Sequence, residues 1–139
     1  MTALVIGTHG KFSEEILRSS EMIFGKQENI ATATFEPGES PDDLVEKYKN
    51  AIEKLDCTNG LLFLVDIFGG SPFNAASRIV AESENMDILT GVNLPMLLEI
   101  YGSRSFSTVE ELIKICKTAA NEGIKSFNET MIGAEDDDL

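Results

Sequence analysis

The chain has 139 residues, of which 42% are hydrophobic and 25% are charged, the size and composition of one ordinary domain with a real hydrophobic core. Asp and Glu number 24 against 11 Lys and Arg, which gives a formal net charge of −13. This balance argues against a protein that binds nucleic acid or an anionic membrane surface, because both need clustered cations.

Short apolar segments alternate with amphipathic stretches along the chain. The run from Thr2 to Thr8 is continuous and apolar, which predicts a strand buried on both faces. Ser40-Pro41 and Ser71-Pro72 are typical helix starts, and Ser107-Thr108-Val109-Glu110 is a capping box that opens the last long helix. Strands are expected at residues 2–8, 29–35, 61–66 and 86–90, and helices at residues 12–24, 41–55, 71–81, 95–101 and 108–123.

Four strand–helix units of this kind predict one α/β domain over residues 1–133, with three α/β/α layers around a mainly parallel four-stranded sheet. Right-handed crossovers leave flavodoxin-like and Rossmann-like strand orders as the main options, and we expect the order 2-1-3-4. Residues 125–132 are the candidate for an antiparallel edge strand at the C-terminus. Residues 134–139 form an acidic tail that we expect to be disordered.

Histidine and cysteine usage limits the chemistry. The single histidine, His9, excludes a site built from several histidine ligands, and Cys57 and Cys116 lack the spacing of a zinc knuckle or a redox dithiol. They are typical of reduced thiols in a cytosolic protein. The N-terminal apolar run is too short for a signal peptide, and no segment approaches the ~20 apolar residues of a membrane span. We therefore expect a cytoplasmic protein that does not insert into membranes.

Two loops are expected to meet at one edge of the predicted sheet. Ligands of such sheets bind beyond the carboxyl ends of the strands, near the point where the strand order reverses. In the order 2-1-3-4 that point lies between strands one and three, which are followed by residues 8–10 and residues 66–71. We therefore expect His9 and Asp66 to project into the same crevice.

These two side chains predict nucleophilic chemistry on the imidazole. An imidazole with one exposed, deprotonated nitrogen is a good nucleophile at neutral pH, and a carboxylate that accepts the other N–H fixes its tautomer. Gly10 and Gly69-Gly70 precede helix N-termini that suit phosphoryl oxygens, and the Thr8 and Ser71 hydroxyls are neutral donors. The pattern favours a histidine that carries a phosphoryl group, without a metal, because the strand ends supply no carboxylate cluster.

Each residue alone also fits an ordinary structural role. A histidine at a strand end is often structural, and Asp66 or Gly69-Gly70 alone would be turn residues. Their coincidence at one sheet edge favours the functional interpretation. Phe68, an aromatic in a loop beside glycines, is either packing cover for the site or an exposed contact for a partner.

Three segments carry a resemblance that spans most of residues 2–123: Val5–Gly10, Leu64–Asn74 and Gly91–Met96. The second contains the distinctive pattern Asp-x-x-Gly-Gly-Ser-Pro-x-Asn. By these motifs the chain resembles the enzyme IIA domains of the mannose family of the bacterial sugar phosphotransferase system.

The resemblance implies that His9 accepts a phosphoryl group from the phosphocarrier HPr and passes it to an enzyme IIB, with Asp66 as its hydrogen-bonded partner. It implies no cofactor. Ser71 and the Gly69-Gly70 backbone would help to hold the phosphoryl group, and Asn93 would lie on a loop lining the same site.

The resemblance also implies a homodimer, because family members exchange a C-terminal strand between subunits, which would use residues 125–132. Phe68 departs from members that carry Trp at this position; it keeps an aromatic ring but lacks the indole N–H.

Other functions remain open from the sequence. The phosphoryl-donor subunit of a dihydroxyacetone kinase system shares the fold and the histidine, although the Gly69–Pro72 block favours the mannose family. A receiver-like signalling module would be phosphorylated on Asp66, but Thr8-His9 stands where receivers need an acidic pair for Mg²⁺. A flavin or dinucleotide module is not favoured, because no G-x-G-x-x-G follows the first strand.

Overall fold

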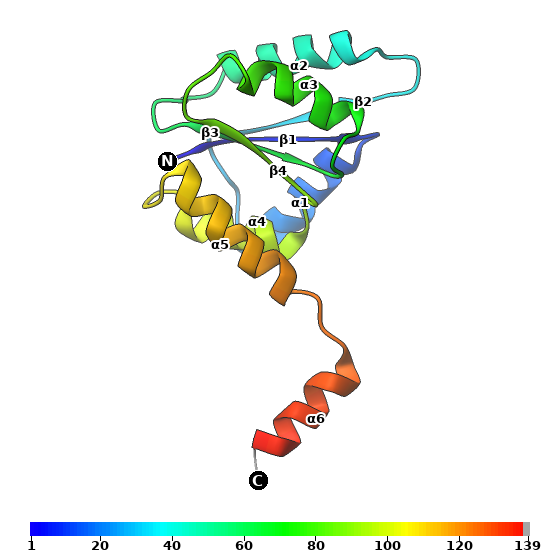
Figure 1. Cartoon of the computed structure of the whole chain (residues 1–139), viewed down its shortest axis with the longest axis vertical. Helices are drawn as coiled ribbons and strands as arrows, with labels where there is room; N and C mark the ends of the chain where they lie inside the picture. Colours follow the sequence, from blue (N-terminus) through cyan, green and yellow to red (C-terminus); the bar gives the residue numbers. More distant parts are fainter. Residues whose placement is uncertain (138–139) are drawn as a thin grey trace.

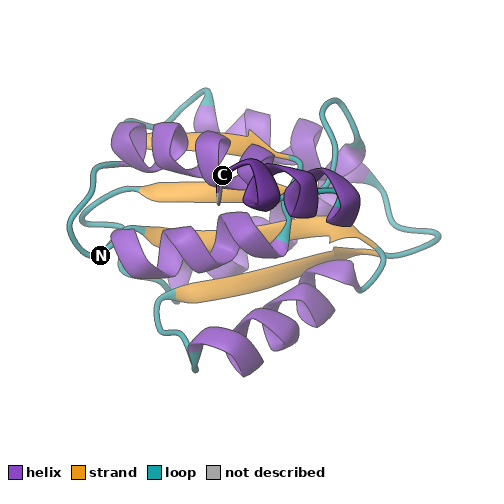
Figure 2. Ribbon diagram, turned by 90° about the horizontal axis from the view of Figure 1, so that it is seen from below, coloured by secondary structure: helices purple, strands orange, loops and turns teal. Residues whose placement is uncertain are grey.

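The structure, a computed structural model, describes residues 1–137 and consists of a four-stranded parallel sheet covered by helices on both faces (Figures 1 and 2). The strands are β1 (Ala3–His9), β2 (Ile30–Phe35), β3 (Leu61–Val65) and β4 (Met86–Thr90). Their order across the sheet is β2-β1-β3-β4, which confirms the predicted order 2-1-3-4.

The helices form two layers around this sheet. One face is covered by α1 (Phe12–Phe24), α4 (Leu94–Ser103) and α5 (Val109–Glu122), and the other by α2 (Pro41–Glu53) and α3 (Ser71–Val80) (Figure 1). The predicted three-layer α/β/α arrangement is therefore confirmed. Within residues 1–137, no helix is both long enough and apolar enough to cross a lipid bilayer.

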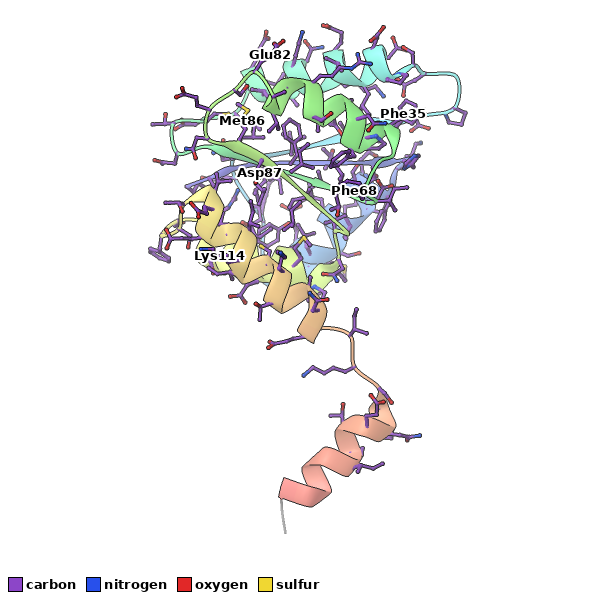
Figure 3. The ribbon with its side chains drawn as sticks, viewed as in Figure 1. Phe35, Phe68, Glu82, Met86, Asp87 and Lys114 are labelled. Carbon is purple, nitrogen blue, oxygen red and sulfur yellow. The ribbon has the colours of Figure 1, made fainter. Side chains whose placement is uncertain are left out.

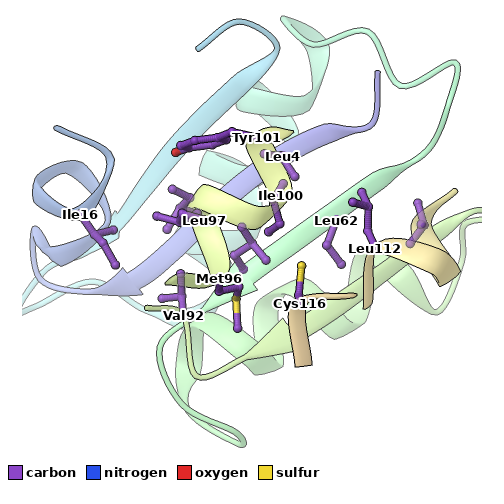
Figure 4. Packing of buried hydrophobic residues seen from close by; sticks show 13 residues of the cluster. Leu4, Ile16, Leu62, Val92, Met96, Leu97, Ile100, Tyr101, Leu112 and Cys116 are labelled. Atoms are coloured by element: carbon purple, nitrogen blue, oxygen red, sulfur yellow. The ribbon is translucent and has the colours of Figure 1, made fainter. Parts of the chain in front are cut away.

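The two central strands, β1 and β3, are the most buried segments of the chain. Residues 3–6 and all of β3 are fully buried. Side chains alternate between the faces of a strand, so Leu4 and Leu62 join the core beneath α1, α4 and α5 (Figure 4), whereas Val5 and Phe63 join the core beneath α2 and α3. Because helices cover both faces, residues 3–6 and 61–65 are apolar without alternation.

Helix caps agree with the sequence at α2 and differ by one residue at α3 and α5. The N-cap residue of α3 is Gly70 rather than Ser71, and no side chain caps this helix. The Ser40 hydroxyl accepts a hydrogen bond from Asp43 N, and the Asp43 carboxylate accepts one from Ser40 N, which closes a capping box. At α5 the box is formed by Thr108 and Glu111, not by Ser107 and Glu110. Both pairs have the required three-residue spacing, and α5 begins one residue later than the first pair would place it.

The C-terminal segment differs from the prediction. Residues 125–132, expected as an antiparallel edge strand, instead lead into helix α6 (Phe127–Asp137), which extends away from the rest of the domain (Figure 1). The edge-strand prediction is wrong here: a segment that pairs with no strand satisfies its backbone N–H and C=O groups locally, as a helix does. Helix α6 includes the first residues of the predicted tail, 134–137, and residues 138–139 lie outside the described part of the chain. That the tail at residues 134–139 is disordered stays a prediction.

Candidate active site

The parallel pairing of β1 and β3 brings the two principal residues of the predicted site to one edge of the sheet. Gly7 lies opposite Val65 in the register, so His9 and Asp66 both follow directly at the carboxyl ends of these strands. Ligands of parallel α/β sheets bind at this edge. The side chains of His9 and Asp66 are in direct contact at this edge.

One carboxylate oxygen of Asp66 holds both the ring and the backbone of the histidine. His9 Nδ1 donates to Asp66 Oδ2 over 2.8 Å, and His9 N donates to the same oxygen over 3.0 Å. The His9 side chain is 47% exposed, whereas that of Asp66 is 15% exposed. Because an ionised carboxylate can only accept, Nδ1 carries the ring proton of the neutral imidazole, and Nε2 keeps its lone pair.

Asp66 is built to remain ionised. Burial raises the pKa of its carboxyl group, but hydrogen bonds from the His9 backbone and ring and from Ile67 N outweigh burial and lower the pKa overall. Ile67 N donates to Oδ1 over 3.0 Å, so both oxygens already accept hydrogen bonds. This arrangement suits a partner that orients an imidazole and does not suit a phosphorylated aspartate of the receiver type.

Two neighbouring groups pack against the imidazole ring. The Phe35 ring meets it edge-on, with centroids 6.0 Å apart and an interplanar angle of 87°. At Gly70 a Cβ atom would lie 2.9 Å from His9 Cε1, so any other residue would force the ring to shift. Phe35 was not predicted as a site residue, although it ends β2 in register with His9 and therefore lies at the same sheet edge.

The N-terminus of α3 lies beside the ring through this Gly70 contact. Gly69 has a φ of +82°, which favours glycine, and Gly70 is the N-cap residue of a helix that has no side-chain cap. Among residues 1–137, no group accepts a hydrogen bond from the backbone N–H of Gly70 or Ser71. These free donors at the positive end of a helix can receive an anion.

Thr8 and Gly10 form hydrogen bonds that support the fold around the site. The Thr8 side chain is fully buried, and its hydroxyl accepts a hydrogen bond from Ser13 N over 2.7 Å, which supports the first turn of α1. Gly10 adopts a φ of +57°, and its N–H donates to the carbonyl of Phe35 over 2.8 Å. The predicted use of the Thr8 hydroxyl as a phosphoryl donor therefore does not fit its placement. That the helix opened by Gly10 receives a phosphoryl oxygen stays a prediction.

Asn93 also serves the fold. It is the N-cap residue of α4, where its Oδ1 accepts a hydrogen bond from Met96 N over 3.0 Å. Its Nδ2 donates to the carbonyl of Ala120 in α5 over 3.3 Å. Because both ends of the amide are occupied, the structure gives Asn93 a role in joining two helices rather than in binding a ligand.

Phe68 is exposed beside the site. Its side chain is 78% exposed, and its ring contacts that of Phe73 with centroids 4.6 Å apart. Figure 3 shows Phe35 and Phe68 at the same end of the domain. Of the two roles predicted for Phe68, this exposure fits a surface contact better than a packing cover.

In the described part of the chain, no group of three or more His, Cys, Asp or Glu side chains could hold a metal ion.

A protein-family model described as "PTS system fructose IIA component" matches residues 3–117, which include every predicted site residue. The chain belongs to this IIA family of the sugar phosphotransferase system. The resemblance inferred from the three sequence segments is thereby confirmed.

Relatives of this IIA domain include proteins of different length. The "PTS system mannose-specific EIIAB component" of Escherichia coli (strain K12) is 47% identical over 126 residues, which cover 90% of this chain but only 39% of that protein. The chain thus spans about two fifths of that relative. The "PTS system fructose-specific EIIA component" of Bacillus subtilis (strain 168) is 38% identical over 93% of this chain and 88% of its own length.

Solved structures agree with the IIA fold. The phosphotransferase system component EIIA from Streptococcus agalactiae superimposes with a TM-score of 0.85 at 33% identity, covering 93% of this chain and 99% of the other. The PTS IIA protein associated with the fucose utilization operon of Streptococcus pneumoniae gives a TM-score of 0.79 at 27% identity and covers 94% of this chain and 99% of its own.

Proposed function

We propose that this IIA domain carries a phosphoryl group on Nε2 of His9, accepting it from phosphorylated HPr and passing it to an enzyme IIB during coupled sugar uptake and phosphorylation. The observation that carries the proposal is the hydrogen bond of 2.8 Å from His9 Nδ1 to Asp66 Oδ2. It leaves the other ring nitrogen with a lone pair on a side chain that is 47% exposed.

Transfer proceeds between two histidines. The Nε2 lone pair of His9 attacks phosphorus in line, the P–N bond to the donor histidine breaks, and its electron pair stays on the donor imidazole. The accepting ring gains positive charge as the new P–N bond forms, and the Asp66 carboxylate stabilises that charge through Nδ1–H. Transfer to enzyme IIB runs the same step in reverse, with its histidine as the attacking nucleophile.

The N-terminus of α3 is the proposed cradle for the phosphoryl oxygens. Its end lies against the His9 ring, and the N–H groups of Gly70 and Ser71 are free within the described residues. Together with the Ser71 hydroxyl they supply neutral donors at the positive end of the helix. Gly69 permits the turn that aims them.

Exposed apolar side chains around this cradle are the proposed contact surface for HPr and enzyme IIB. Phe68 and Ile67 are 78% and 55% exposed, and such side chains commonly form the centre of a protein interface. The net charge of −13 would speed encounter with basic partner surfaces and make the association rate fall with added salt.

A homodimer and a cytoplasmic location complete the proposal. Large hydrophobic side chains of the C-terminal segment are exposed, namely Ile124, Phe127, Met131 and Ile132, and a second copy of the chain would cover them. The two free cysteines support a reducing compartment. Light scattering during size-exclusion chromatography tests the dimer: a chain truncated after Gly123 should be monomeric, and a dimer that survives truncation would assign the interface elsewhere.

Labelling by phosphorylated HPr tests the carrier function. The wild-type chain should take up one acid-labile, base-stable phosphoryl group and release it to enzyme IIB. Because His9 is the only histidine, His9→Ala should take up none. Retained labelling in His9→Ala, or an unlabelled wild-type chain, would refute the proposal.

A further inference from the structure

Helix α2 supplies none of the residues predicted for the site, yet one of its side chains lies directly beneath it. Tyr48 is fully buried, and its hydroxyl donates a hydrogen bond to the carbonyl of Pro72 over 3.0 Å. Pro72 lies in the first turn of α3 and follows Ser71 in the proposed phosphoryl cradle. The phenol therefore holds the helix end that faces the histidine.

The same hydroxyl also lies against β1, two residues before the histidine. At Gly7 a Cβ atom would lie only 2.0 Å from Tyr48 Oη and 2.7 Å from Cζ. Glycine at this position is thus what lets the phenol reach between β1 and α3. One buried group touches both the strand that carries His9 and the helix turn that carries the cradle.

The phenol is itself held rigidly and remains protonated. Its ring packs against Phe63 of β3 with centroids 5.0 Å apart and an interplanar angle of 65°. Burial raises the pKa of Tyr48, and the nearby negative charge of Asp66 raises it further. The hydroxyl therefore keeps its proton, and with it the hydrogen bond to Pro72, throughout the physiological pH range.

We infer that Tyr48 is a positioning residue for phosphoryl transfer: its hydroxyl fixes the first turn of α3 relative to β1, so that the Gly70 and Ser71 N–H groups meet the oxygens of a phosphoryl group on His9. The need for such a support follows from the site itself, because α3 has no side-chain cap and is preceded by two glycines. The inference rests on the proposed function.

Tyr48→Phe tests it, because this variant keeps the packed ring and removes only the donor. The chain offers a matched control in Tyr101 (Figure 4). Its buried hydroxyl forms a 2.8 Å hydrogen bond with Ser20 Oγ on the opposite face of the sheet. Tyr101→Phe also removes one buried hydroxyl, but Tyr101 belongs to α4 and its partner Ser20 to α1. Both variants should lose a similar, small amount of thermal stability.

Rapid-quench transfer from phosphorylated HPr separates the two variants. Tyr48→Phe should lower the rate at saturating donor by about tenfold, because a small misplacement of catalytic groups is costly, while the half-saturating donor concentration stays within twofold. Tyr101→Phe should match the wild type in both. A Tyr48→Phe rate equal to that of Tyr101→Phe, or a change confined to half-saturation, would overturn the inference.

A second measurement keeps the hydroxyl in place. The chain has two tyrosines, so Tyr101→Phe protein made with 3-fluorotyrosine carries fluorine at Tyr48 alone. Its ¹⁹F resonance should shift when His9 becomes phosphorylated, and an unmoved resonance would contradict the coupling. If the wild-type chain accepts no phosphoryl group at all, the proposed function fails and this inference with it; a labelled wild type with an unaffected Tyr48→Phe refutes the inference alone.

Discussion

Replacing Asp66 by asparagine separates the charge of this side chain from its shape. In the wild type, Oδ2 accepts from His9 N and Nδ1, and Oδ1 accepts from Ile67 N. An amide has one oxygen and one NH₂ group. If its oxygen faces His9, the NH₂ group opposes the Ile67 N–H; if it faces Ile67, the NH₂ group opposes the histidine and moves the ring proton to Nε2.

The free-energy cost of each orientation can be estimated from the hydrogen bonds that it loses. A hydrogen bond to a charged group contributes about 1.5–3 kcal/mol, and one between neutral groups about 1 kcal/mol. The ring gains positive charge during transfer, so losing the carboxylate destabilises the transition state by about 1–2 kcal/mol, which lowers the transfer rate roughly 5- to 30-fold. The wrong tautomer blocks Nε2 and adds to this loss. We expect Asp66→Asn to slow transfer by about 10- to 100-fold.

Single-turnover labelling with phosphorylated HPr measures this rate, and ¹⁵N spectroscopy of the imidazole identifies which nitrogen carries the proton. Asp42→Asn is the matched control, because it changes the net charge equally at an exposed residue that pairs with Arg78. It should keep nearly the wild-type rate. A rate for Asp66→Asn within threefold of the wild type, in a folded protein, would refute the orienting role of the carboxylate.

Three further changes test the geometry around this pair. Gly70→Ala places a Cβ 2.9 Å from His9 Cε1 and should slow labelling by about tenfold with little change in a urea denaturation curve; wild-type labelling would show that the ring has room to move. Gly7→Ala forces a buried Cβ into Tyr48 Oη and should lower the free energy of unfolding by about 3 kcal/mol or more, whereas an unchanged curve would mean that the phenol relocates freely. Although burial raises the pKa of Asp66, its hydrogen bonds hold the pKa below the usual range, so its contribution to folding is complete above about pH 4 and lost on further acidification. In acid titrations of the unfolding midpoint, the wild type should therefore lose stability more steeply than Asp66→Asn. Parallel curves for the two proteins would contradict this.

Much of the fold was predictable because its signals are local. The apolar runs of β1 and β3 and the Ser40 cap depend on neighbouring residues, and the parallel order follows from the helices between the strands. Predicting the contact between His9 and Asp66 then required only the rule that the ends of parallel strands meet at one edge of the sheet. Gly70 was also predicted, but as a backbone donor; its role in leaving room for the imidazole depends on the distance between α3 and His9, which no local pattern gives.

The remaining features depend on distances between segments far apart in the sequence. No pattern in the sequence indicates that the Tyr48 hydroxyl meets the carbonyl of Pro72. The Thr8 hydroxyl and the Asn93 amide have the chemistry of ligand donors, and only packing reveals that backbone groups already occupy them. The C-terminal segment is similar, because whether it forms a strand or a helix depends on a pairing partner and not on its own residues.

His9 ends β1 and Asp66 follows β3, and residues 3–6 and 61–65 of these strands are fully buried. This attachment has a consequence for how the protein loses activity. Segments with the densest burial open only when the whole domain unfolds, whereas loops and termini open far more readily. The reacting pair therefore has no weak hinge of its own, and heat should abolish phosphoryl acceptance in the same transition that melts the sheet. Amide protons of β1 and β3 should exchange with solvent most slowly of all, so the nucleophile is attached to the part of the molecule that unfolds last.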